Sequence, residues 1–108
     1  MAGEVTAIVT HYPKQDKIEE FRDLCLRVKN IFKDFPGKLD QHAIEVETEE
    51  GVEIIVIEKF KDQESADNVL ASDEFKKVGE LVPALVRLPP KVIQGTPLPG
   101  FRTSEKGI

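Results

Sequence analysis

The apolar residues of the chain recur in two patterns, one typical of strands and the other of helices. Residues 5–12 form a run rich in valine, isoleucine and threonine in which odd and even positions both carry apolar groups, and Pro13 follows it. Such a run predicts a β-strand that has other elements packed on both faces.

The second pattern begins at Lys17 and has apolar residues at steps of three and four. These positions are Ile18, Phe21, Leu24, Cys25, Val28, Ile31, Phe32 and Phe35. The spacing predicts an amphipathic helix of about five turns with one broad apolar stripe. Asp16 is the expected N-cap, and Pro36 with Gly37 is expected to end the helix.

Two more strands are predicted after this helix. Over residues 39–47, isoleucine and valine come to alternate with glutamate, which indicates an outer strand with one polar face. The Glu-Glu-Gly sequence at 49–51 is expected to form a hairpin turn. Residues 52–60 contain an unbroken apolar run at 54–57, which is typical of a central strand covered on both faces.

A second helical region begins near Gln63 and is expected to have two pieces. The first covers residues 66–70, with Asp62 or Ser65 as its cap. Ser72 begins the second, which carries acidic residues in its first turn, where they are favourable against the helix dipole.

The apolar stripe of this second piece continues through Val82 and Leu85, although Pro83 is expected to kink or interrupt it. Two prolines at 89–90 end the helical region, and residues 91–96 are predicted to form a short edge strand. We therefore place one domain at residues 1–96 and a tail at residues 97–108, ordered only if Phe101 finds a pocket.

The predicted order β-α-β-β-α-β is that of the ferredoxin-like α+β fold, an antiparallel sheet with helices on one face. Because the first and third strands are apolar on both faces, the face without helices needs a cover. A second copy of the same sheet is the simplest one. The pattern therefore predicts a homodimer that associates through the sheet face.

Composition narrows the possible partners and the compartment. The chain has 108 residues and a net charge of -5, with basic residues interleaved among acidic ones. This argues against a nucleic acid or an anionic membrane as partner. No apolar run approaches the roughly 20 residues that cross a bilayer, and the first residues do not resemble a secretion signal. The lone Cys25 suits a reducing compartment, so a cytoplasmic location is expected.

A family resemblance rests on three short stretches. These are IEKFKD at 57–62, Ala66, and LASDEFK at 70–76. In element order residues 5–96 resemble the antibiotic biosynthesis monooxygenase family of dimeric α/β barrels, whose members have a strand ending in an apolar-Glu-x-aromatic pattern and a Ser/Thr-led break between helices. The resemblance implies a barrel formed across a dimer and a pocket in each subunit between sheet and helices. It also implies oxygenation of an activated phenol or quinol, often without a cofactor.

The chain departs from this family at the polar positions of the helices. Many relatives have His or Trp at the position aligned with Val69 and another His near Glu74. Relatives that cleave haem have a ligating His at the position aligned with Gly79. Haem cleavage by that route is therefore not expected.

His11 and His42 are the two histidines of the chain, and an imidazole titrates near neutral pH. His11, at the end of the first strand, is the expected general base, with His42 as a substrate-binding candidate. The alternative is that both are solvated residues at strand ends. Two isolated histidines without a Cys or carboxylate cluster do not predict a metal site.

Four further residues are candidates for binding a substrate: Tyr12, Glu58, Asn68 and Phe75. The carboxylate of Glu58 interrupts an apolar strand, so it either orients a substrate hydroxyl or pairs with Lys or Arg across the dimer seam. The phenylalanines also fit a plain hydrophobic core, and Cys25 fits an inert buried thiol.

The leading hypothesis is a cofactor-independent monooxygenase that acts on a small aromatic or quinol-type molecule. The alternative is a non-catalytic module that binds a small apolar or aromatic ligand on the same barrel, and an isomerase or cyclase fits the same pocket.

Overall fold

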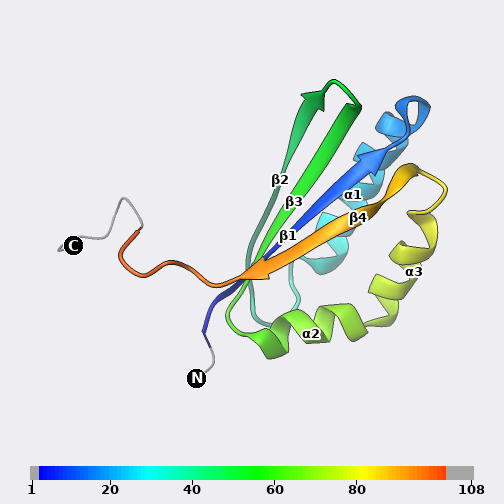
Figure 1. The fold of residues 1–108 in the computed structure, drawn as a ribbon. Coiled ribbons are helices and arrows are strands. Elements are labelled where there is room, and N and C mark those ends of the chain that lie inside the picture. Colours follow the sequence, from blue (N-terminus) through cyan, green and yellow to red (C-terminus); the bar gives the residue numbers. More distant parts are fainter. Residues whose placement is uncertain (1–2, 102–108) are drawn as a thin grey trace.

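The computed structural model describes residues 3–101, which form one sheet with helices on one side (Figure 1). The elements are β1 (Val5–Pro13), the 3₁₀ turn η1 (Gln15–Lys17), α1 (Ile18–Phe32), β2 (Lys38–Thr48), β3 (Gly51–Phe60), α2 (Gln63–Ala71), α3 (Asp73–Leu81) and β4 (Val86–Gly95). The antiparallel sheet has the strand order β2-β3-β1-β4. The predicted ferredoxin-like α+β fold is confirmed, with the second helix of the pattern divided into α2 and α3.

The register of β1 against β3 decides which side chains face the helices. Val5 pairs with Phe60, Ala7 with Glu58 and His11 with Ile54. Val5, Phe60 and Ile54 are buried, and alternate residues of a strand share one face. His11 and Glu58 therefore lie on the helix-facing side of the sheet, four residues apart along the strand direction.

The core lies between that side of the sheet and the apolar faces of the helices. Phe32, Phe60, Ala66 and Val69 form its buried centre, and the partly buried residues packed against them are Ala7, Val28, Phe35 and Val78. The apolar stripe predicted for α1 is confirmed by Phe21, Leu24 and Phe32, which are its buried residues.

Both predicted ends of α1 need correction. Asp16 lies inside η1 and makes no capping bond, because the Lys17 N–H donates to the Lys14 carbonyl and the turn starts earlier. The helix ends at Phe32, since the Phe35 N–H turns back onto the Phe32 carbonyl ahead of Pro36.

The caps of the later helices follow the prediction. Of the two candidates for α2, Asp62 is the cap, and its carboxylate accepts from the N–H of Ser65 at 2.8 Å. Ser72 caps α3 by accepting from the Phe75 N–H at 3.1 Å. The helix ends at Leu81, so the stripe does not continue to Leu85 in helical form.

Strand β4 begins earlier than predicted and includes both prolines. It starts at Val86, and its register against β1 shifts between the pairs Thr10–Lys91 and Tyr12–Leu88. Because β4 is the edge strand, a proline that lacks an N–H costs no ladder hydrogen bond on the side away from β1. The predicted edge position is confirmed, and the predicted start at residue 91 is wrong.

The face of the sheet away from the helices is apolar and has no cover among residues 3–101. We call it the open face. Its aliphatic residues are Ile8, Ile44, Val46, Ile55, Ile57, Leu88 and Ile93. Ile44 and Ile93, on the outer strands, are 48% and 51% exposed. None of the described helices is long and apolar enough to cross a membrane.

The segment after β4 leaves the edge of the sheet (Figure 1). A shallow pocket of about 210 Å³ is lined by Glu4, Thr6, Lys59, Pro97, Leu98 and Phe101. Phe101 is nevertheless 79% exposed, so this pocket does not bury its ring. Of the proposed tail, residues 102–108 lie outside the described part of the chain, as do residues 1–2.

Candidate functional site

His11 projects from β1 toward α1. Its ring lies 4.9 Å from the ring of Phe21, centroid to centroid, at an interplanar angle of 52°. Nδ1 is buried and has no hydrogen-bond partner among the described residues. A buried nitrogen without a partner is unfavourable by about 1–3 kcal/mol, so a hydroxyl that enters here gains a ready partner.

The surroundings of His11 favour its neutral form. Burial lowers the pKa of the imidazole below its ordinary value of 6.5, and the negative charge of Glu58 partly opposes this effect. A neutral imidazole can accept a proton at neutral pH, which a general base requires.

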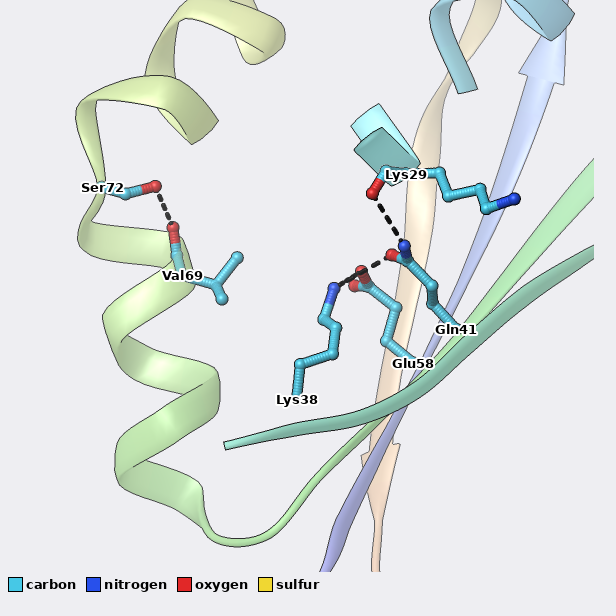
Figure 2. A network of polar contacts seen from close by, with 6 residues as sticks. All are labelled: Lys29, Lys38, Gln41, Glu58, Val69 and Ser72. Carbon is cyan, nitrogen blue, oxygen red and sulfur yellow. Dashed lines mark hydrogen bonds and ion pairs between the residues drawn. The ribbon is translucent and has the colours of Figure 1, made fainter. Parts of the chain in front are cut away.

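Glu58 forms an ion pair with Lys38 of the same chain, at 2.6 Å between Oε1 and Nζ (Figure 2). The side chains of Lys38 and Glu58 are 2% and 17% exposed, so the pair is largely removed from water. The predicted partner, a Lys or Arg across a dimer seam, is therefore wrong. The partner comes from the first residue of β2, which the register places beside the last residue of β3.

Further contacts fix the ammonium group of Lys38. Nζ donates to Gln41 Oε1 at 3.1 Å, and Gln41 Nε2 donates to the Lys29 carbonyl at 2.9 Å (Figure 2). Nζ also lies 5.7 Å and 5.2 Å from the ring centroids of Phe32 and Phe60. A desolvated cation near aromatic faces gains cation–π attraction in addition to the ion pair.

Gly37 sets the position of Lys38. Its φ of 83° is a left-handed conformation that favours glycine, and a Cβ here would overlap the side chain of Ser65 in α2. The Gly37 carbonyl accepts from the Lys61 N–H at 2.8 Å. The turn into β2 thus packs closely against the start of α2 and directs Lys38 into the interior.

Sequence reasoning missed Lys38 and Gln41. They lie beside Glu58 only because of a register shift between Lys38 and Asp40 in the pairing of β2 with β3. The one available signal was Glu58 itself, since a carboxylate in an apolar strand needs a cationic partner.

The other predicted site residues lie in three places. Phe75 of α3 is on the helix side, with its ring centroid 6.3 Å from that of Phe32. Asn68 is exposed on α2. Tyr12 and His42 are on the open face, as the strand pairing shows. His11 and Glu58 thus lie on the helix-facing side of the sheet and Phe75, which is 38% exposed, on a helix of that side, whereas Tyr12 and His42 lie on the opposite face.

The two open-face residues have polar neighbours of their own. The guanidinium of Arg87 lies 5.7 Å from the ring centroid of Tyr12 and donates to the carbonyls of Pro13 and Val52. His42 Nδ1 is 3.5 Å from a carboxylate oxygen of Asp40, and both side chains are largely exposed.

Two of the positions at which the chain departs from the family that it resembles, Val69 and Gly79, carry no polar side chain. Val69 is buried in the core cluster. Gly79 lies on α3, where an added Cβ would meet nothing within 4 Å. Cys25 is half-buried, and burial raises the pKa of its thiol to about 11, so it stays protonated at neutral pH.

Metal-binding geometry is not found within residues 3–101, where no group of three or more His, Cys, Asp or Glu side chains comes together. On the surface, Arg22 of α1 and Glu45 of β2 form a two-point ion pair with both N–O distances at 2.7 Å. These hydrogen bonds lower the pKa of Glu45.

Comparison with solved structures gives several matches to the whole domain. SnoaB, a cofactor-independent oxygenase from Streptomyces nogalater, has a TM-score of 0.80 at 18% identity, over 97% of this chain and 100% of that one. Rv0793 from Mycobacterium tuberculosis has a TM-score of 0.76 at 20% identity, over 89% and 96% of the two chains. A conserved protein from Methanosarcina mazei Go1 has a TM-score of 0.79 at 19% identity, over 88% and 93%. At these identities the likeness shows a shared fold.

A search among curated proteins gave no match. The family model described as antibiotic biosynthesis monooxygenase matches residues 4–81, which include His11, the Lys38–Glu58 pair and both pieces of the second helix. Since this match spans most of the sequence, the chain belongs to the antibiotic biosynthesis monooxygenase family.

Proposed function

We propose that the protein is a cofactor-independent oxygenase that acts on a small aromatic or quinol-type molecule, with His11 as general base. The observation that carries this proposal is the imidazole of His11, which is half-buried against Phe21 with its Nδ1 unpaired among the described residues. Burial keeps it neutral, so it can accept the proton of a phenol placed beside it. SnoaB, which shares the fold, is a cofactor-independent oxygenase.

The chemistry needs little from the protein beyond binding and deprotonation. Loss of the phenolic proton to His11 leaves an electron-rich anion, which itself transfers electrons to O₂. One oxygen atom enters the product as a new carbonyl, and the other leaves as water. The apolar side chains on the helix-facing side of the sheet would exclude water, and the Phe21 ring beside His11 would help to orient the substrate ring.

The remaining substrate-binding candidates have less support from the geometry. Glu58 is engaged by Lys38, Asn68 is exposed, and Tyr12 and His42 lie on the other side of the sheet. We assign His11 and the partly exposed Phe75 to the substrate, and we propose that Tyr12 and His42 lie at a dimer interface.

The dimer itself is part of the proposal. The open face carries seven aliphatic residues on neighbouring strands, and pairing two such faces removes them from water without a further element. This arrangement also accounts for an apolar strand β3 that has helices on one side only.

A non-catalytic binding module on the same barrel is the second candidate. It is favoured by Val69 and Gly79, which provide no polar group where many relatives of the resembling family carry one. Under this proposal the interior still binds an aromatic molecule but does not activate it toward oxygen.

The test is oxygen consumption with a naphthoquinol and a polyhydroxylated anthrone as probes, beside binding of the same probes under anaerobic conditions. We expect the wild type to consume O₂ above the spontaneous rate and His11→Ala to lose at least about tenfold of this activity while still binding the probe. Glu49→Gln, in the exposed β2–β3 turn, is the control.

Binding without any catalysed oxygen consumption would favour the second candidate. Full activity in His11→Ala would show that another group acts as the base.

A further inference from the structure

The buried Lys38–Glu58 pair lies on the same side of the sheet as His11 but takes no direct part in the proposed reaction. The pair is made by the first residue of β2 and a residue near the end of β3. Replacement of such a pair by apolar side chains is often neutral or stabilising, so stability alone gives a weak reason for it. The pair shares the helix-facing side of the sheet with the candidate base, four residues away along the strand direction, and charges on a largely desolvated side of a sheet act over such separations.

Of the charged groups around His11, Glu58 is the one that affects the protonation of the imidazole. From β2, Glu45 occupies the same row across the sheet as Ile54 and His11, but Arg22 of α1 holds its carboxylate at two points. The contact from α1 is the uncharged ring of Phe21. On β4 the helix-facing Val92, which pairs with Val9, is uncharged, and the guanidinium of Arg87 donates to the Pro13 and Val52 carbonyls and lies against the ring of Tyr12, which is on the open face.

Glu58 is thus the carboxylate whose field reaches His11, and Lys38 is the cation that opposes it at 2.6 Å. In an interior of low effective dielectric constant, a bare carboxylate would favour the protonated imidazole. A carboxylate paired with an ammonium group presents a dipole, whose field is weaker and falls off faster with distance.

We propose that Lys38 is a positioning residue for the reaction: by pairing with Glu58 it withholds a bare carboxylate from His11 and keeps the imidazole in its proton-accepting form. This inference rests on the role proposed above for His11, and it is confined to residues of one chain. The ammonium group is itself held by Gln41 and by the rings of Phe32 and Phe60, so its position does not depend on a ligand.

The experiment follows the protonation of His11 by NMR titration of its imidazole, with no substrate present. Lys38→Met should raise the titration midpoint by roughly half a pH unit or more, because it exposes His11 to an unopposed carboxylate. Glu58→Gln should lower the midpoint, because it leaves the ammonium group alone. The double variant Lys38→Met/Glu58→Gln should return the midpoint close to that of the wild type.

Two controls separate charge from structure. Lys29→Met removes an exposed lysine whose side chain points away from the pair, although its carbonyl belongs to the network (Figure 2), and it should leave the midpoint unchanged. Lys38→Arg keeps the charge and should stay near the wild-type midpoint. If Lys38→Met does not fold, the other two variants still test the proposal: Glu58→Gln should lower the midpoint and Lys38→Arg should leave it near that of the wild type.

Shifts in the same direction for Lys38→Met and Glu58→Gln, or no shift in either, would overturn the proposal. With a probe that is turned over, the acidic limb of the pH–rate profile should move with the NMR midpoint. If the midpoints move as expected but no probe is oxidised by the wild type, the electrostatic coupling stands and the oxygenase function fails.

Discussion

The two faces of the same sheet differ in how they are covered. On the helix-facing side Val5, Ile54 and Phe60 are buried by helices of the same chain. On the open face, residues of the same kind, such as Ile44 and Ile93, keep about half of their surface in water. Both faces of the sheet are therefore apolar, but the helices of one chain cover only one of them. An apolar face that a chain does not cover itself indicates an interaction surface for another molecule.

The faces also differ in how they treat polar groups. The interior side desolvates His11 and buries the Lys38–Glu58 pair, whereas the open side leaves His42 exposed and the ring of Tyr12 beneath Arg87. Desolvation is what moves an imidazole away from its solution behaviour. This difference supports the proposal that the chemistry takes place on the interior side and that association takes place on the open face.

The largest expected effect comes from a charge on the open face. Ile44 is about half exposed in one chain, so Ile44→Asp should fold as a hydrated monomer, yet a symmetric dimer would bury the new carboxylate twice. We expect the dimer dissociation constant to rise at least about 100-fold, measured by sedimentation equilibrium.

Leu26→Asp makes the same change at a 59% exposed position on α1 and should leave the dimer intact. Dissociation by Leu26→Asp but not by Ile44→Asp would place the interface on the helices. A monomeric wild type would remove the dimer proposal altogether.

Two glycines on the helix side of the sheet differ in the space that an added side chain would find. Gly37→Ala should lower the free energy of unfolding by roughly 3 kcal/mol, because it forces a left-handed alanine against Ser65. Gly79→Ala should raise it by up to about 1 kcal/mol, since it adds a better helix former where nothing is in the way. Urea unfolding measures both, and equal effects of the two changes would contradict the close packing at Gly37.

The burial of His11 also makes stability depend on pH. Because its pKa is lowered in the folded protein, the unfolded chain binds the proton more tightly at mildly acidic pH. The wild type should therefore keep its full stability above about pH 6.5 and lose part of it as the pH falls through the lowered pKa. In His11→Phe this part of the pH dependence should vanish, as read from urea midpoints across that range. An unchanged slope would indicate that His11 is solvated.

The smallest effect concerns Cys25. Since burial raises its thiol pKa to about 11, alkylation by iodoacetamide at neutral pH should be much slower in the native protein than in urea. Equal rates would show that the thiol on α1 is open to solvent.

Element order could be predicted from the sequence because it depends on local patterns. The apolar stripe of α1 and the caps Asp62 and Ser72 depend only on residues that are close together in the sequence, and the structure confirms them. The start of β4 was predicted wrongly for the same reason: whether a strand tolerates a proline depends on its edge position in the sheet, and local sequence does not contain that information.

The candidate site could be predicted only in part. His11 and Glu58 stand out as polar residues in apolar strands, but their shared face follows from the pairing of β1 with β3. Lys38 lies 20 positions before Glu58 and comes beside it through a register shift at the start of β2. Pairings of this kind depend on the whole sheet, so residue type and spacing alone cannot predict them.

The strand order also has a consequence for how the chain reaches its native state. Strands β2 and β3 are joined by a tight hairpin, so they can pair as soon as both exist. Strand β1 must wait for β4, since Ile8 pairs with Ile93 from the far end of the domain. Closing that long loop is entropically slow, so β1 is the strand that stays unpaired on its outer edge the longest. During synthesis on the ribosome, β1, which carries the candidate base, is therefore made first but is the last to have strands paired on both of its edges.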